Sequence, residues 1–221
     1  EQLLGDARRP FVSILGGAKV SSKIGLIQNL LDRVDRIIIG GGMAFTFFKA
    51  AGLEIGESLL EEDYLPMCRS MMEKAGKGAE KRIYLPVDCM VAKDVNDPAG
   101  SRTVSTGDIL EGWAGVDIGE STMEVFSREI ARAATIFWNG PMGIFEIPAF
   151  SNGTRMIARA IAEATDKGAT SVVGGGDSVA ALNQMHLDSR VSHVSTGGGA
   201  SLELLEGKRL PGVEALSDAD S

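Results

Sequence analysis

Five short apolar runs in this chain each end at a glycine or a glycine-containing turn, and a stretch with helical periodicity follows. The runs are residues 11–15, 36–39, 135–138, 170–173 and 193–195. Short apolar runs closed by glycine predict buried strands. Strands that alternate with helices predict parallel pairing, right-handed crossovers and helices on both faces. We therefore expect an α/β fold of three layers, α/β/α. Its centre would be a Rossmann-like, doubly wound and mainly parallel sheet.

Apolar positions repeat at intervals of three and four in the stretches between these runs, which predicts amphipathic helices. We expect helices over residues 21–31, 44–51, 61–75, 121–133, 152–165, 177–186 and 199–206. Pro66 fits only near the start of its helix or at a kink. Residues 76–119 are the least regular part, with two short strands expected at 82–85 and 89–92. We interpret that stretch as an excursion from the main sheet.

The glycine junctions are the main candidates for chemistry, because ligands of doubly wound sheets bind outside the carboxyl ends of the strands. Helix N-termini that converge there offer backbone amides and a positive dipole end to an anion such as a polyphosphate. Glycine lets such a ligand approach the backbone, since no Cβ is in the way. The residues Thr196, Gly197, Gly198 and Gly199 form the least ambiguous junction, with three consecutive glycines before an expected helix.

Lys19 and Lys23 follow the first junction and lie four residues apart. The dipole makes a helix N-terminus unfavourable for lysine unless an anion lies nearby. Two lysines there favour an anion site, although both also fit a solvated surface.

Asp177 and Ser178 follow Gly174, Gly175 and Gly176. An aspartate in this place is an ordinary N-cap. Alternatively its carboxylate binds Mg²⁺ carried on phosphates, with the Ser178 hydroxyl beside it.

Asn139, Gly140 and Pro141 form an ordinary turn sequence, and Glu146 follows closely. The Asn139 amide can contact a phosphate, and Glu146 can accept hydrogen bonds from ribose hydroxyls. His186 and His193 fit structural roles better, because no Ser or Cys partner spacing supports a nucleophile triad.

The composition narrows the function classes. With 22 Lys and Arg against 30 Asp and Glu, the net charge is −8, which argues against nucleic acid and anionic membranes as partners. The two cysteines, Cys68 and Cys89, form no CxxC pair, so we expect no structural disulfide and no zinc site. No apolar run approaches the ~20 residues that cross a bilayer. The chain begins Glu-Gln-Leu-Leu, without Met or a signal-peptide pattern, which fits a fragment or a processed product.

Neither common nucleotide signature is present: there is no GxxxxGK[ST] loop, and no G-x-G-x-x-G follows a strand. A dehydrogenase-type Rossmann domain shares the fold pattern but should carry that dinucleotide fingerprint. A folding or interaction unit that binds no nucleotide is the other alternative. An NADH titration addresses the first alternative, and calorimetry with MgADP addresses the second.

Six ordered motifs together resemble phosphoglycerate kinase, and more narrowly its C-terminal, nucleotide-binding half. They are Gly16-Gly17-Ala18-Lys19-Val20 with Lys23, the segment 40–45, Leu85-Pro86-Val87-Asp88, the segment 138–141 with Phe145-Glu146, the segment 174–177, and the segment 191–201. The resemblance runs from about Pro10 to Leu216. Ser178 stands where many members carry Thr, and Ser21-Ser22 replaces a commoner Ala-Asp.

The resemblance implies transfer of a phosphoryl group between 1,3-bisphosphoglycerate and MgADP in glycolysis, or the reverse reaction. It implies that Lys19 follows the transferring group, with the amides of Gly197, Gly198 and Gly199, and that Lys23 holds nucleotide phosphates. The remaining nucleotide contacts that it implies are Gly17, Ala18, Gly40, Gly41, Gly42, Asn139, Pro141, Glu146, Gly174, Gly175, Gly176, Asp177 and Ser178. Asp177 would also bind the Mg²⁺ ion of ADP or ATP.

The resemblance also implies a domain organisation and a limit on activity. Residues 1–9 would be a remnant of the interdomain connection, residues 10–210 the nucleotide-binding domain, and residues 211–221 a C-terminal tail. The family's N-terminal half, whose basic patch grips 3-phosphoglycerate or 1,3-bisphosphoglycerate, has no counterpart here. We therefore expect the isolated chain to bind nucleotide and to be essentially inactive, and, as in the family, to be a cytoplasmic monomer.

Overall fold

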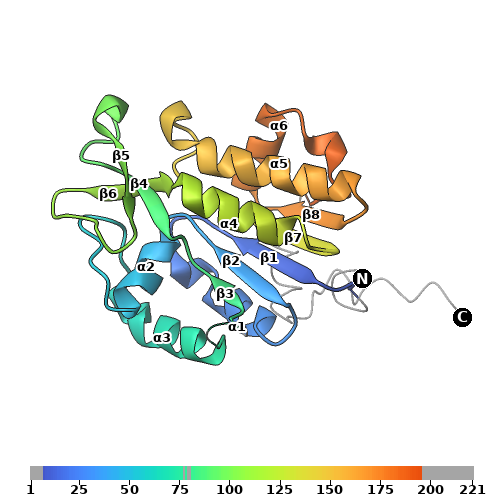
Figure 1. The fold of residues 1–221 in the computed structure, drawn as a ribbon, viewed down its shortest axis with the longest axis horizontal. Helices are drawn as coiled ribbons and strands as arrows, with labels where there is room; N and C mark the ends of the chain where they lie inside the picture. Colours follow the sequence, from blue (N-terminus) through green and yellow to red (C-terminus); the bar gives the residue numbers. More distant parts are fainter. Residues whose placement is uncertain (1–6, 77, 79–80, 196–221) are drawn as a thin grey trace, which may run out of the picture.

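The computed structural model describes residues 7–76, 78 and 81–195. A six-stranded sheet in the order β3-β2-β1-β7-β8-β9, parallel at every pairing, forms its centre. The strands are β1 (Phe11–Leu15), β2 (Arg36–Ile39), β3 (Ile83–Tyr84), β7 (Thr135–Asn139), β8 (Thr170–Gly174) and β9 (His193–Ser195). Figure 1 shows the sheet between two layers of helices, as the strand and helix alternation predicts.

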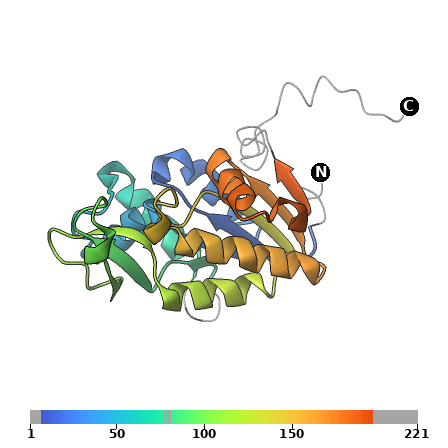
Figure 2. The same cartoon turned by 90° about the horizontal axis from the view of Figure 1, so that it is seen from above.

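The helices divide evenly between the two faces of the sheet (Figures 1 and 2). One face carries α1 (Ile24–Leu30), α2 (Met43–Ala50) and α3 (Leu65–Lys74), and the other carries α4 (Glu120–Ile130), α5 (Asn152–Asp166) and α6 (Gly176–Gln184). Alternation along the strands explains the division: Phe11 and Leu15 of β1 pack on the first layer, whereas Val12 and Ile14 pack on the second. The sheet is therefore buried on both sides, as a parallel sheet requires.

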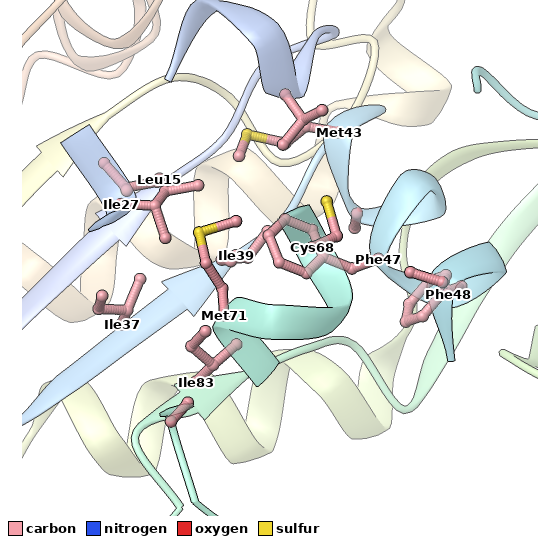
Figure 3. Close-up of a cluster of buried hydrophobic side chains, with 14 of the residues drawn as sticks. Leu15, Ile27, Ile37, Ile39, Met43, Phe47, Phe48, Cys68, Met71 and Ile83 are labelled. Atoms are coloured by element: carbon pink, nitrogen blue, oxygen red, sulfur yellow. The ribbon is translucent and has the colours of Figure 1, made fainter. Parts of the chain in front are cut away.

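The first helical layer forms a dense apolar core with β1 and β2. Figure 3 shows Phe47 of α2 beside Cys68 of α3, with Ile39 of β2 and Met71 of α3 close by. Pro66 is accommodated in the first turn of α3, where no intrahelical amide bond is lost. The expected helix 61–75 is confirmed as a 3₁₀ turn, Glu62–Tyr64, followed by α3.

The irregular stretch 76–119 is only partly an excursion from the main sheet. The strands β4 (Asp88–Ala92), β5 (Arg102–Ser105) and β6 (Ala114–Ile118) form a separate antiparallel sheet in the order β5-β4-β6. The excursion and the strand expected at 89–92 are thus confirmed, whereas β5 and β6 were not predicted. The interpretation is wrong for β3, which pairs with β2 as an edge strand of the main sheet. Two paired residues are too short a run for sequence patterns to assign to a sheet.

The strand order places a topological switch between β1 and β7. The chain proceeds from β1 outward to β2 and β3, and later returns on the other side of β1 with β7, β8 and β9. Leu15, Asn139 and Gly174 are in register at the carboxyl ends of β1, β7 and β8. The crevice at such a switch is the ordinary ligand site of doubly wound folds. No helix in the described part of the chain is long and apolar enough to cross a membrane.

Candidate functional site

A cavity of about 440 Å³ opens beside the carboxyl ends of β1, β2 and β7. This volume lies within the range of small-molecule sites. Gly17 and Ala18 line it after β1, Gly41 and Gly42 after β2, and Pro141 with Glu146 after β7. Further walls come from α2 and from β6, and Asp177 of α6 borders the cavity as well. The cavity therefore lies at the edge that the glycine junctions predict.

Three glycines at the ends of β1, β2 and β7, namely Gly16, Gly41 and Gly140, are packed against protein backbone. A Cβ on Gly16 would lie 2.0 Å from the carbonyl oxygen of Pro141, and one on Gly140 would lie 2.3 Å from that of Gly16. Gly41 has φ +68° and touches the backbone of Gly17. At these positions glycine lets three strand ends meet, so close backbone contact inside the protein is itself a sufficient reason for it.

Several of the amides expected to be bare are already bonded. The N–H of Gly16 donates to the carbonyl of Asn139 at 2.9 Å, that of Gly17 to Pro141 at 2.9 Å, and that of Gly41 to Met142 at 3.1 Å. The expectation of free anion-binding amides is therefore wrong at these three positions, because neighbouring strand ends bond to each other. Gly40 donates in the same way to Leu15, at 2.9 Å.

Lys23 is buried, with 8% of its surface exposed, and precedes α1 directly. Its ammonium donates to the carbonyl oxygen of Gly16 and, at 3.0 Å, to that of Asn139. Burial lowers the pKa of Lys23 to about 8, an effect that the negative charge of Asp177 partly offsets. A buried ammonium bonded to neutral carbonyls, with a carboxylate near enough to act on it, is suited to an anionic ligand.

Lys19 has a different environment from Lys23. It is exposed and extended before the 3₁₀ turn Val20–Ser22, and its charge helps to lower the pKa of Glu61. Because α1 begins only at Ile24, neither lysine lies in a first helical turn, which corrects that part of the sequence prediction.

Asn139 holds a buried donor without a partner. The residue is 3% exposed, and its Nδ2 has no hydrogen-bond partner among the described residues. A Cβ on Gly175, which has φ +89°, would lie 2.8 Å from this atom. An unpaired buried donor is costly unless a ligand satisfies it. Ser178 is fully buried, and its Oγ accepts a hydrogen bond from the Gly140 amide at 2.6 Å.

Asp177 and Glu146 are exposed carboxylates at the border of the cavity. In the part of the chain that the structure describes, neither has a hydrogen-bond or ion-pair partner. No group of three or more His, Cys, Asp or Glu side chains that could hold a metal occurs among the described residues. Asp177 alone fits a magnesium ion that takes its other ligands from phosphates and water.

The structure separates the predicted residues into three sets. Those that line the cavity are Gly17, Ala18, Gly41, Gly42, Pro141, Glu146 and Asp177. Those described but not lining it are Lys19, Lys23, Gly40, Asn139, Gly174, Gly175, Gly176 and Ser178. Gly197, Gly198 and Gly199 lie outside the described residues, as does the helix expected at 199–206.

Sequence reasoning missed the wall that the small sheet contributes. Strand β6 (residues 114–118) lines the cavity, although none of the five glycine junctions lies in this strand. Gly115 contacts α2 directly, since a Cβ there would lie 1.9 Å from the ring of Phe45. Asp117 is 4% exposed and borders the same cavity. The sequence does carry one signal for this wall, because Asp117 is a charged residue between the apolar Val116 and Ile118. The irregular pattern of residues 76–119 hides it.

Asp88, the last residue of the Leu-Pro-Val-Asp motif, holds the start of α4. Its carboxylate accepts hydrogen bonds from the amides of Ser121 at 3.0 Å and Thr122 at 2.8 Å. Gly119, at the N-cap position of α4, has no side chain, so the Asp88 carboxylate takes the capping role.

Cys68 and Cys89 are free and buried, and burial raises the pKa of each thiol to about 12.

The fold and the cavity define a doubly wound α/β domain with a ligand site at its switch point. Comparison with known proteins makes this specific: the sequence profile described as Phosphoglycerate kinase matches residues 1–208. The chain belongs to the phosphoglycerate kinase family.

Curated relatives named phosphoglycerate kinase are 56% identical in Rubrobacter xylanophilus and 52% identical in Chlorobaculum tepidum. They cover 99% and 97% of this chain, which in turn covers 54% of each of them. The chain therefore spans about half the length of the curated relatives it matches.

Solved structures agree with the fold. The phosphoglycerate kinase of Coxiella burnetii matches with a TM-score of 0.91 and 44% identity, over 96% of this chain and 54% of the other. The enzyme of Pyrococcus horikoshii OT3 matches with a TM-score of 0.81 and 30% identity, over 97% of this chain and 53% of the other.

Proposed function

We propose that this chain is the nucleotide-binding half of a phosphoglycerate kinase and holds MgADP or MgATP in the cavity at the ends of β1, β2 and β7. The proposal depends on one observation: the site has an apolar part and a charged part side by side. One part is an apolar slot between the 41–42 turn, α2 and β6. The other gathers Asp177, the ammonium of Lys23 and the unpaired amide of Asn139 around the strand ends.

This division suits a nucleotide. A purine is flat and apolar on its faces and fits a slot walled by glycines and aliphatic side chains. The phosphates carry the charge that a buried ammonium, an unpaired amide donor and a metal-binding carboxylate satisfy together. Glu146, on the border of the cavity, is the acceptor that we assign to the ribose hydroxyls.

The reaction assigned to the complete enzyme is transfer of a phosphoryl group between 1,3-bisphosphoglycerate and ADP. Such transfer requires in-line positioning and stabilisation of charge on the equatorial oxygens, with little covalent chemistry from the protein. Mg²⁺, when bound with the nucleotide, neutralises phosphate charge. In this chain Lys23 and Asn139 would hold phosphate oxygens, and Asp177 would bind the Mg²⁺ ion. Lys19 and the amides of Gly197, Gly198 and Gly199 would stabilise the transferred group.

The phosphoglycerate is held by a separate part of the enzyme. Within the described residues, the cavity is bordered by no cluster of arginine or histidine that could grip a second phosphorylated ligand. A water-excluded site then requires closure of the two parts around both substrates. The chain on its own is a monomer that binds nucleotide and turns over negligibly, in the cytoplasm as befits a glycolytic enzyme.

Calorimetric titration with ADP, in the presence and absence of Mg²⁺, tests this function. We expect saturable binding that Mg²⁺ strengthens, with the dependence on Mg²⁺ lost in Asp177→Ala and retained, at lower affinity, in Lys23→Ala. A coupled assay of ATP formation should give negligible turnover. Absence of heat at millimolar MgADP would leave a non-binding folding unit as the better account, and saturable binding of NADH would favour a dinucleotide site.

A further inference from the structure

Asp117 is a buried carboxylate in the wall of the cavity, and no cationic side chain of the described residues pairs with it. It lies in β6, is 4% exposed and borders the cavity. Its Oδ1 accepts a hydrogen bond from the amide of Ile118 at 2.9 Å, and its Oδ2 accepts one from the amide of Gly153 at 2.8 Å. Buried carboxylates without a paired charge are rare in proteins, because desolvation of the charge is costly.

Three parts of the structure meet at this side chain. A Cβ on Gly143 would lie 2.4 Å from Oδ1 of Asp117, and a Cβ on Gly153 would lie 2.3 Å from the same atom. Gly143 begins the turn that leads to Glu146, and Gly153 lies in the first turn of α5. The same turn is attached to β6 by the hydrogen bond from the Ile144 amide to the Val116 carbonyl, at 2.9 Å. Asp117 thus joins the small sheet, the Glu146 turn and α5.

Burial and backbone amides, and no described charged side chain, set the charge state of Asp117. Burial raises the pKa of Asp117 to about 7, although the amides of Gly153, Ile118 and Asn152 act in the opposite direction. Ionisable side chains on the elements packed around it or bordering the same cavity include Asp88, Cys89, Glu120, Arg155, Glu57, Glu146 and Asp177, with Glu124, Arg128, Glu129, Arg159, Glu163 and Asp166 farther along α4 and α5. None of them is an ion-pair partner of Asp117 in the described part of the chain, and none is among the causes of its shift.

We propose that Asp117 is a positioning residue for the nucleotide site: its ionised carboxylate holds the turn that carries Glu146 against β6 and α5, and so sets the width of the cavity. This inference rests on the proposed function and adds to it a residue that does not touch the ligand's reacting atoms. An ionised carboxylate accepts every amide that faces it, whereas a protonated one presents a donor to one of them. Protonation therefore weakens the attachment of β6 to α5 and, because Gly143 packs against Oδ1 of the same carboxylate, loosens the Glu146 turn.

The effect of Asp117 on folding stability favours a functional reason for an aspartate at this position. Because the folded state raises the pKa of Asp117, ionisation of this group costs folding stability, and the cost grows as pH rises from about 4 to about 7. A residue whose charged form destabilises the fold, in the wall of a ligand cavity, is a candidate for a functional site.

The test compares Asp117→Asn with a matched control, Asp88→Asn. Asp88 also accepts two backbone amides at a helix start, but it does not border the cavity. In calorimetric titrations with MgADP from pH 5.5 to 8.5, we expect Asp117→Asn to bind about tenfold more weakly than the wild type at pH 8. The ratio of the two affinities should shrink through a midpoint near pH 7, whereas Asp88→Asn should follow the wild type at every pH.

A second measurement needs no nucleotide. The NMR shifts of the Gly143 and Gly153 amides should titrate with the same midpoint in the wild type and in Asp88→Asn, and not in Asp117→Asn. Equal affinities of Asp117→Asn and the wild type at all pH values, or no titration of these amides, would overturn the inference. If the wild type fails to bind MgADP, the proposed function is wrong, and the amide titration still decides whether Asp117 holds the turn.

Discussion

The junction after β1 and the junction after β8 are both rich in glycine, yet their glycines have different surroundings. A Cβ on Gly16 would meet the carbonyl oxygen of Pro141 at 2.0 Å, and the Gly16 amide is bonded to Asn139. A Cβ on Gly176 would meet no atom within 4 Å, and one on Gly175 would lie 2.8 Å from a side-chain atom, the Nδ2 of Asn139, which has no partner among the described residues. Glycine at a strand end thus marks either backbone contact or an open site, and the sequence alone does not distinguish the two.

Exchanging each glycine for alanine tests this contrast and gives the largest effect that we expect. Gly16→Ala forces two backbones apart and should lower the free energy of unfolding by about 3 kcal/mol. Gly176→Ala, at the first position of α6, should change it by no more than about 1 kcal/mol, in the stabilising direction. Urea unfolding measures both. Equal losses in the two variants would show that the junctions do not differ as described.

The burial of Lys23 should appear as a pH dependence of stability. Its pKa in the folded state, about 8, lies below the ordinary 10.5, so between these values the unfolded chain binds a proton that the folded chain does not. The free energy of unfolding should therefore rise from pH 8 to 10.5, by an amount on the order of 1–3 kcal/mol. Lys23→Met should lack this rise in urea unfolding experiments. Parallel pH profiles for the two proteins would contradict the burial of a charged ammonium.

The unpaired amide of Asn139 gives the smallest expected effect on stability, with a separate effect on binding. Asn139→Leu replaces a buried donor by an apolar group of similar shape and should raise the free energy of unfolding by about 1 kcal/mol. The same change should weaken MgADP binding about tenfold, because the phosphate contact is lost. Asn183→Leu, on the exposed face of α6, is the control and should leave both quantities unchanged. If Asn139→Leu lowers the free energy of unfolding and leaves the affinity for MgADP unchanged, the Asn139 amide stabilises the fold and does not bind the nucleotide.

Most of the architecture is predictable from the sequence, because short apolar runs closed by glycine-containing turns, such as 11–15 and 135–138, favour buried strands. The edge strand β3 is not, since its pairing depends on β2, far from it in the sequence. The site is predictable where glycine and charge coincide, as at Asp177. Its small-sheet wall is not, because the aspartate between apolar neighbours marks Asp117 as unusual but does not show that β6 packs against Phe45 of α2, far from it in the sequence.

The crystal structure of the chain with MgADP is the most direct test of the central claim, that the strand ends of β1, β2, β7 and β8 form a nucleotide site. We predict the purine between the 41–42 turn and β6, Glu146 at the ribose, and the phosphates within hydrogen-bond distance of Asn139 and Lys23, with Mg²⁺ at Asp177. Density for the nucleotide at any other surface, with the cavity beside β1 empty, would contradict the account.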